Sequence, residues 1–251
     1  MTPRPNPPFR ADHVGSLLRP PELLTARELF VDGRIDAAQL RAAEDEAIAA
    51  AIHMQEAIGL KSATDGEMRR ESWHMDFIYG IDGIQEEETD LVIAFKGATH
   101  KPSDARIVSP LKLDDPIFGE AFEFVRDNVT TATPKLTIPS PSMVHHRAAH
   151  AIDDGVYANA EEFWADLTRV YERELSGLHD LGCRYLQLDD VRFAMLNDPG
   201  QREAMAARGE DPDKLHLEYI AHFNDAVAGR PDDMAITTHM CRGNFRSTWQ
   251  A

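Results

Sequence analysis

The sequence predicts an α/β protein built on parallel strands, because one pattern occurs three times along its 251 residues. In each occurrence an amphipathic helix ends at a glycine, a short apolar strand follows, and polar side chains stand just after the strand. These polar groups fall at residues 65–67, 189–190 and 239–241. If the sheet closes, the fold is a TIM-type (β/α)8 barrel, and the three groups meet at its mouth.

The first helix of the pattern is predicted over residues 36–58. Asp36 can cap this helix together with Gln39, three positions later, and Gly59 can supply the left-handed residue that ends it. A strand over residues 60–64 should follow and deliver Glu67 just beyond its end. The apolar stripe of the helix comprises Leu40, Ala43, Ala47, Ile48, Ala51 and Ile52.

The second and third occurrences predict two more helix–strand units. A helix that ends at Gly182 precedes a strand over residues 183–188, which Cys183 begins and which leads to Asp189. A helix capped by Asp211, with Pro212 in its first turn, runs to Gly229 and precedes a strand over residues 234–238. The second helix carries Phe163, Trp164, Leu167, Val170, Tyr171, Leu175 and Leu178 on its apolar stripe.

Further strands are expected over residues 13–16, 134–138 and 91–95, the last inside a long excursion between residues 84 and 129. The total is about six of the eight strands that a closed barrel needs. We therefore expect a barrel domain over residues 9–251 that is incomplete at its C-terminus, preceded by a loose Pro-rich tail at residues 1–8. An open barrel exposes unpaired strand edges, so self-association into a homo-oligomer, or a partner, is expected.

Composition excludes several classes of protein. A net charge of −17 argues against binding to nucleic acid or to an anionic membrane surface, and no apolar run is long enough to span a bilayer. No signal peptide is evident, so a cytoplasmic location is expected. Cys183 and Cys241 are too few for a disulfide framework, which leaves Cys241 available as a ligand or nucleophile.

His239 and Cys241 are candidate zinc ligands. Side chains two positions apart on a strand point to the same face, and zinc accepts mixed nitrogen and sulfur donors. The pair is half of a tetrahedral set. The alternative is a buried cysteine beside a hydrogen-bonded histidine, since the chain holds 11 histidines.

Glu67 and Asp189 are two carboxylates at the ends of different strands. There they can bind an ammonium group, act as general acid and base, or bind a metal. Solvated or capping acids are the alternative, and Asp190 is expected to be such a capping residue.

Ser16, after Gly15, can face a carboxylate. A stacking and anion-binding surface is one interpretation of Arg69, Arg70, Trp73 and His74, whereas His145 and His146 are expected to be exposed in a loop.

Four motifs in their order along the chain resemble the cobalamin-independent methionine synthases, and most closely the short members that match the catalytic barrel. They are HVGS at 13–16, TDGE at 64–67 followed by RRESWH at 69–74, YLQLDD at 185–190 and THMCRGN at 238–244.

The resemblance implies a zinc-dependent methyltransferase that methylates the thiol of homocysteine, with a 5-methyltetrahydrofolate-type donor, to give methionine. By position, His239 and Cys241 match two zinc ligands. Glu67 and Asp189 match the acids that hold the amino group of homocysteine, Asp189 being the catalytic one of the two, and Ser16 matches a residue near its carboxylate. Small molecules are therefore the expected partners.

The chain also departs from the family pattern. The remaining zinc ligands, a glutamate and a second cysteine, and a proton-donating histidine follow the position of Cys241 in the family and have no match here. Residues 139–143 lack a folate-stacking tryptophan, and Met195 stands where a folate-contacting glutamate is found. Two alternatives therefore remain: a related zinc enzyme that acts on another thiol, such as a coenzyme M conjugate, or an inactive, truncated binding protein.

Overall fold

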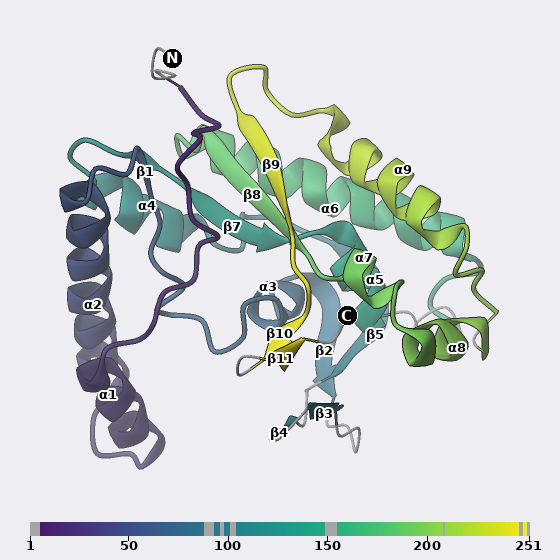
Figure 1. Ribbon diagram of the computed structural model, residues 1–251, viewed down its shortest axis with the longest axis horizontal. Helices are drawn as coiled ribbons and strands as arrows, with labels where there is room; N and C mark the ends of the chain where they lie inside the picture. The colour runs from purple at the N-terminus through teal and green to yellow at the C-terminus, as the bar shows by residue number, and fades with distance from the viewer. Residues whose placement is uncertain are drawn as a thin grey trace.

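The computed structural model describes residues 6–87, 93–95, 98–100, 104–148, 155–207, 209–245 and 248–249. A parallel three-stranded sheet in the order β7 (Leu136–Pro139), β8 (Tyr185–Asp190) and β9 (Ala235–Met240) forms its centre (Figure 1). The register aligns Pro139 with Asp189, and Asp189 with His239. The carboxyl ends of the three strands therefore lie side by side, as an α/β fold requires.

Helices α6 (Ala160–Asp180) and α9 (Leu215–Ala228) pack against each other beside this sheet (Figure 1). The predicted stripe of α6 is confirmed, because all seven of its apolar side chains belong to the main core. The short helices α5 (Pro141–Ala148), α7 (Arg192–Met195) and α8 (Pro199–Ala207) follow strands β7 and β8. Helices α5 and α7 thus begin just past the carboxyl ends of two neighbouring strands.

The N-terminal part forms a second core. Helix α2 (Ala37–Ala57) has the predicted capping box between Asp36 and Gln39, and Gly59 has a φ of 89°. Strand β1 (Ser62–Ala63) pairs in parallel with β6 (Thr133–Pro134), and α1 (Pro21–Val31) and α4 (Gly119–Asn128) pack against α2. The second core comprises Leu23, Ala47, Ile48, Ala51, Ile52, Ala63, Met68, Val125 and Ala132.

The excursion between residues 84 and 129 holds an antiparallel arm instead of one more parallel strand. After α3 (Met75–Tyr79), strand β2 (Asp82–Glu87) pairs with β5 (Asp104–Lys112). Part of the strand predicted over residues 91–95 appears as β3 (Ile93–Phe95), which pairs with β4 (Ala98–His100), whereas residues 91 and 92 lie outside the described residues. A last hairpin joins β10 (Asn244–Phe245) to β11 (Thr248–Trp249).

Three expectations about local structure were wrong. Residues 13–16 form no strand; side chains of other elements bind their carbonyl groups instead. Helix α9 begins at Leu215 and not at Asp211, because the Asp211 carbonyl accepts the Lys214 N–H and forms a turn. His145 is a buried residue of α5, where its ring stacks on Trp164 at 4.9 Å.

The α/β class is confirmed, but the barrel is not, since the described strands form separate short sheets. Residues 1–5 of the predicted tail lie outside the described residues, so the tail and the domain bounds stay predictions. None of the helices in the described part of the chain is long and apolar enough to cross a membrane.

Candidate functional site

Glu67 is placed by an unusual backbone turn directly after β1. Its φ of 57° is the one positive value found among the described residues other than glycine, and it follows Gly66, whose φ is 65°. The Glu67 N–H donates to Asp65 Oδ1 at 2.9 Å, which stabilises the turn. A left-handed glutamate is strained, and such strain concentrates at functional sites because the surrounding structure must maintain it.

The Glu67 carboxylate is buried and has one oxygen engaged. Oε1 accepts a hydrogen bond from Thr137 Oγ1 at 2.9 Å and lies 3.5 Å from Arg70 Nη1. Burial raises the pKa of Glu67 above its ordinary value, Arg70 and Thr137 oppose this rise, and the charges of Asp65 and Asp189 add to it. The Asp189 carboxylate is therefore near enough to act on Glu67 electrostatically.

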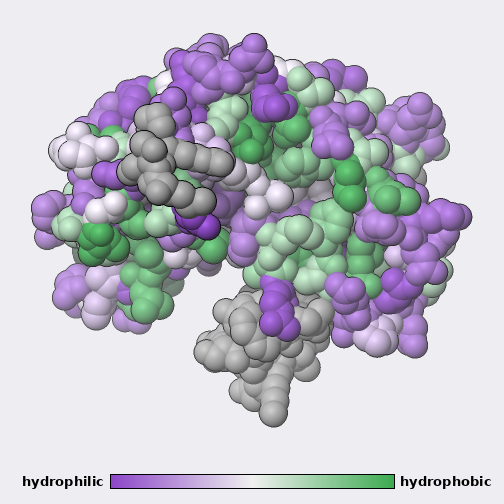
Figure 2. Space-filling model, turned by 45° about the horizontal axis from the view of Figure 1, so that its top comes forward, coloured by the Kyte–Doolittle hydropathy of each residue, from purple (hydrophilic) through white to green (hydrophobic). Residues whose placement is uncertain are grey.

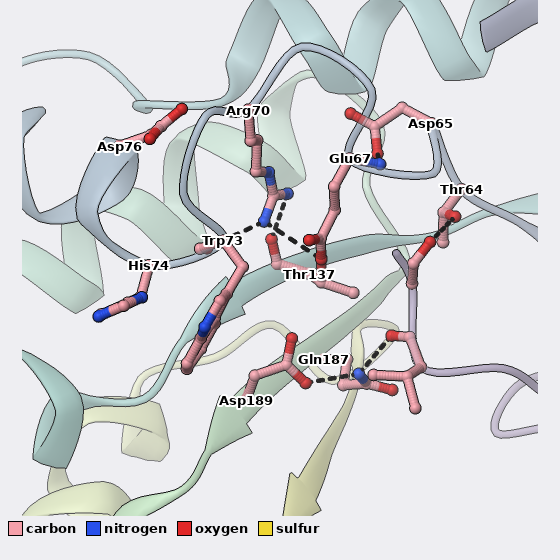
Figure 3. A network of polar contacts seen from close by, with 12 residues as sticks. Thr64, Asp65, Glu67, Arg70, Trp73, His74, Asp76, Thr137, Gln187 and Asp189 are labelled. Atoms are coloured by element: carbon pink, nitrogen blue, oxygen red, sulfur yellow. Dashed lines mark hydrogen bonds and ion pairs between the residues drawn. The ribbon is translucent and has the colours of Figure 1, made fainter. Parts of the chain in front are cut away.

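Arg70 fixes the geometry around Glu67. It is 4% exposed, and its guanidinium lies over the Phe118 ring at 4.2 Å. Nη2 donates to the Thr137 carbonyl at 2.6 Å, and Nη1 donates to the Trp73 carbonyl at 3.4 Å (Figure 3). One arginine thus connects Glu67, strand β7 and the loop that carries Trp73.

Asp189 lies in β8, next to the matching positions of β7 and β9. Its Oδ1 accepts from Gln187 Nε2 at 2.6 Å and lies 3.3 Å from His239 Nδ1. Gln187 Nε2 also donates to the Val14 carbonyl at 2.6 Å, which links the N-terminal segment to β8. Figure 3 shows Asp189 facing the same space as Glu67, with the Trp73 indole beside it.

The structure thus brings Glu67, Asp189 and His239 together. Each carboxylate uses one oxygen for contacts with the protein, whereas Glu67 Oε2 and Asp189 Oδ2 have no hydrogen-bond partner among the described residues. Two acceptor oxygens on nearby carboxylates suit a cation with several N–H donors, such as an ammonium group.

His239 and Cys241 lie at the carboxyl end of β9. His239 is the fifth residue of β9, and Cys241 lies just past the strand, with its N–H donating to the Asp190 carbonyl at 2.6 Å. A contact between His239 Nδ1 and a carboxylate is the arrangement that commonly orients a metal-binding imidazole. Across the described residues, however, no group of three or more His, Cys, Asp or Glu side chains could hold a metal. These residues fit half of a zinc site, not a closed one.

Ser16 is exposed at the edge of the same site. The preceding Gly15 is buried, and a Cβ added there would meet Thr137 Cγ2 at 2.6 Å and Glu67 Oε1 at 3.3 Å. The backbone before Ser16 therefore approaches the Glu67 carboxylate as closely as a glycine permits. Ser16 thus lies near Glu67, and its hydroxyl group has no hydrogen-bond partner within the described part of the chain.

Other candidates have structural roles. The expectation for Asp190 is confirmed, because its Oδ2 accepts from Ser140 Oγ at 2.6 Å and its Oδ1 accepts the Arg192 N–H, which caps α7. Arg69 points to α2, where it pairs with Asp45, and does not belong to the mouth.

Sequence reasoning missed Thr137, Gln187 and Arg19. Gln187 stands two positions before Asp189, so strand periodicity could have found it on the same face. Thr137 could have been found in the same way from the strand that ends at Pro139. Arg19, whose Nη2 donates to the carbonyls of Glu67 at 3.0 Å and Arg70 at 2.6 Å, has no sequence signal, because it comes from an irregular segment.

Comparison with known proteins shows the family to which this chain is similar. Residues 9–250 match the family described as the cobalamin-independent synthase catalytic domain. The uncharacterized protein YxjH of Bacillus subtilis is 42% identical over 97% of this chain and 64% of its own length. The methionine synthase of Pyrococcus abyssi is 28% identical over 92% of this chain and 61% of its own. The chain thus spans less than two thirds of these relatives.

A solved structure leads to the same family. It is described as a putative vitamin-B12 independent methionine synthase and comes from Listeria monocytogenes. This structure superposes with a TM-score of 0.77 and 36% identity, and the match covers 95% of this chain and 67% of that one. The chain therefore belongs to the cobalamin-independent synthase catalytic-domain family.

Proposed function

We propose that this chain carries the amino-acid site of a methyltransferase that moves a methyl group to the thiol of homocysteine, giving methionine. The observation that carries the proposal is the pair of available oxygens, Glu67 Oε2 and Asp189 Oδ2, on carboxylates that face one space (Figure 3). Burial is the main cause that raises the pKa of Glu67, and an ammonium group between the two acids would offset both this burial and the smaller repulsion from Asp189. The backbone at Ser16 would then face the substrate carboxylate.

The chemistry needs a thiolate directed at a methyl carbon. The S–C bond forms while the bond between the methyl carbon and the donor breaks, and its electron pair leaves with the donor. Glu67 and Asp189 would fix the amino end of homocysteine, so that the sulfur reaches toward His239 and Cys241. A folate-type molecule is the proposed donor.

Zinc is the proposed cofactor, with His239 and Cys241 as two of its ligands and the others outside the described residues. A bound zinc ion would keep the substrate thiol deprotonated. With the contact of His239 Nδ1 to Asp189 in place, Nε2 is the nitrogen left for a metal.

An assay of methyl transfer with homocysteine and 5-methyltetrahydrofolate tests the proposal. Glu67→Gln and Asp189→Asn should each raise KM for homocysteine about tenfold or more, because each removes a charged acceptor of the ammonium group. Glu161→Gln removes an exposed acid from α6 and serves as the control. Unchanged KM values in both site variants would refute the assignment.

A panel of thiols separates the proposal from its rival. 2-Mercaptoethanesulfonate, the thiol of coenzyme M, has no ammonium group, so the two acids would repel its sulfonate. Homocysteine should therefore be methylated much faster. Faster methylation of the sulfonate thiol would favour the alternative enzyme, and methylation of neither would favour a binding protein.

A further inference from the structure

Arg147 is anchored beside the mouth through a single nitrogen. It lies in the last turn of α5, the helix that starts directly after β7. Its Nε donates to His74 Nε2 at 3.2 Å, and His74 Nδ1 lies 3.2 Å from Ser72 Oγ, so the imidazole is held from both sides. The His74 ring packs on Trp73 with a centroid distance of 4.4 Å. A chain of contacts thus joins Arg147 to the wall of the site.

The other two nitrogens of this guanidinium are available. Within the described part of the chain, neither Nη1 nor Nη2 of Arg147 has a hydrogen-bond or ion-pair partner. Burial lowers the pKa of Arg147, Asp104 and Tyr79 oppose this, and the nearby Arg192 adds to it. Arg147 is half-buried, and a cation that is partly removed from water and has no ion-paired anion favours the binding of an anion.

Two other arginines near the site use terminal nitrogens for contacts with the protein. Arg70 donates both terminal nitrogens to backbone carbonyls, and Arg19 donates Nη2 to two of them. The C-terminal turn of α5 favours a positive charge at position 147. It does not explain why Nε has a partner while the two terminal nitrogens, Nη1 and Nη2, have none. A guanidinium group that is held through Nε presents Nη1 and Nη2 in a fixed orientation, which suits a planar or tetrahedral anion.

Arg147 contacts His74 and neither of the two acids. The His74 ring packs on Trp73, and Figure 3 shows the Trp73 indole beside Asp189. A net charge of −17 repels anions at long range, so an anionic group needs a local cation to bind. We propose that Arg147 forms a second subsite of the mouth, which binds the carboxylate or phosphate group of a ligand other than the amino acid.

Anion titrations test this subsite without any methyl-transfer assay. Inorganic phosphate and acetate are titrated separately into the full chain at constant ionic strength maintained with sodium chloride, and tryptophan fluorescence and the thermal unfolding midpoint are followed. At least one of the two anions should bind saturably. Tighter binding of phosphate would indicate a phosphate ligand, and tighter binding of acetate would indicate a carboxylate ligand. Arg147→Gln should weaken that binding about tenfold or more, and Arg147→Lys by less, because lysine keeps the charge but not the fork.

Arg169→Gln is the control, since it removes the same charge from an exposed arginine of α6. Trp73→Phe should abolish the fluorescence response while leaving the phosphate- or acetate-dependent midpoint shift. Equal anion affinity in the wild type, Arg147→Gln and Arg147→Lys would overturn the proposal, as would no saturable binding in either arm. Failure of the homocysteine assay would not change the anion-binding result, so the proposed methyltransferase function and the proposed Arg147 subsite can be refuted independently.

Discussion

Arg70 and Glu67 illustrate how a charged site is maintained inside a fold. Glu67 is held in a left-handed conformation and is buried, and both features are unfavourable unless neighbouring groups compensate. Arg70 compensates at 3.5 Å while its own charge is satisfied by backbone carbonyls and by the Phe118 ring. Arg70 therefore acts as a positioning residue and favours the anionic form of Glu67, which the proposed ammonium ligand would need.

Arg70→Gln should shift the pH dependence of homocysteine binding. Since Arg70 lowers the pKa of Glu67, its removal should raise that pKa, and the acid limb of a KM–pH profile should move to higher pH. Arg169→Gln should leave the profile unchanged. An unshifted acid limb in a folded Arg70→Gln variant would show that Arg70 does not act through Glu67.

At the scale of elements, side-chain caps decide where several segments begin. The sequence predicted the start of α2 correctly, because Asp36 and Gln39 form a reciprocal pair that needs no tertiary contact. The start of α9 was predicted incorrectly, since Asp211 instead forms a turn and an ion pair with Lys214. Residues 13–16 look like a strand but are held by Thr64, Lys135 and Gln187. Such contacts between distant segments have no local signal.

Asp36→Ala should therefore destabilise the protein by about 1 kcal/mol, because it removes the bond that the Gln39 N–H donates to Asp36 Oδ1. Urea unfolding followed by circular dichroism measures the change. Asp32→Ala, which alters a residue just beyond α1 that has no such box, is the comparison and should change stability much less.

The contact between α6 and the segment just before α4 should depend on pH. Glu174 of α6 is fully buried and accepts the Ile117 N–H at 2.8 Å, and burial raises its pKa from 4.5 to about 7. A raised folded-state pKa gives stability that is present below pH 4.5 and is lost as pH rises through 7, by about 3 kcal/mol at most.

Unfolding free energies of the wild type and Glu174→Gln, measured from pH 4 to 8, should show this dependence. The wild type should lose stability relative to the variant as pH rises, because glutamine does not ionise. Glu172→Gln, on the exposed side of the same helix, should follow the wild type. A constant difference between the wild type and Glu174→Gln would contradict the assignment.

In the whole molecule, β9 forms an outer edge of the central three-stranded sheet. Among the described residues β9 pairs with β8 alone, and Met240 is 58% exposed near its end. Figure 2 shows hydrophobic surface gathered in patches on one face. The sequence predicted unpaired strand edges. It also predicted that the carboxyl ends of β8 and β9 meet, because the same helix–strand unit repeats along the chain. It could not predict the register that sets Asp189 beside His239, since register follows from packing.

Self-association through this edge should be measurable. Sedimentation at increasing protein concentration should show oligomers, and Met240→Lys should reduce them by placing a charge at the edge. The exposed Leu217 of α9 provides the matched control, Leu217→Lys. Equal association of both variants would place the contact elsewhere.

The proposed site requires that Glu67 and Asp189 together bind the ammonium group of an amino-acid thiol. Calorimetric titration with homocysteine and with 4-sulfanylbutanoate, which lacks the amino group, measures this contribution. The wild type should prefer homocysteine strongly, and Glu67→Gln/Asp189→Asn should lose that preference while still binding 4-sulfanylbutanoate at least as well as the wild type does. A wild type that binds both thiols equally, or a double variant that keeps the preference, would contradict the account.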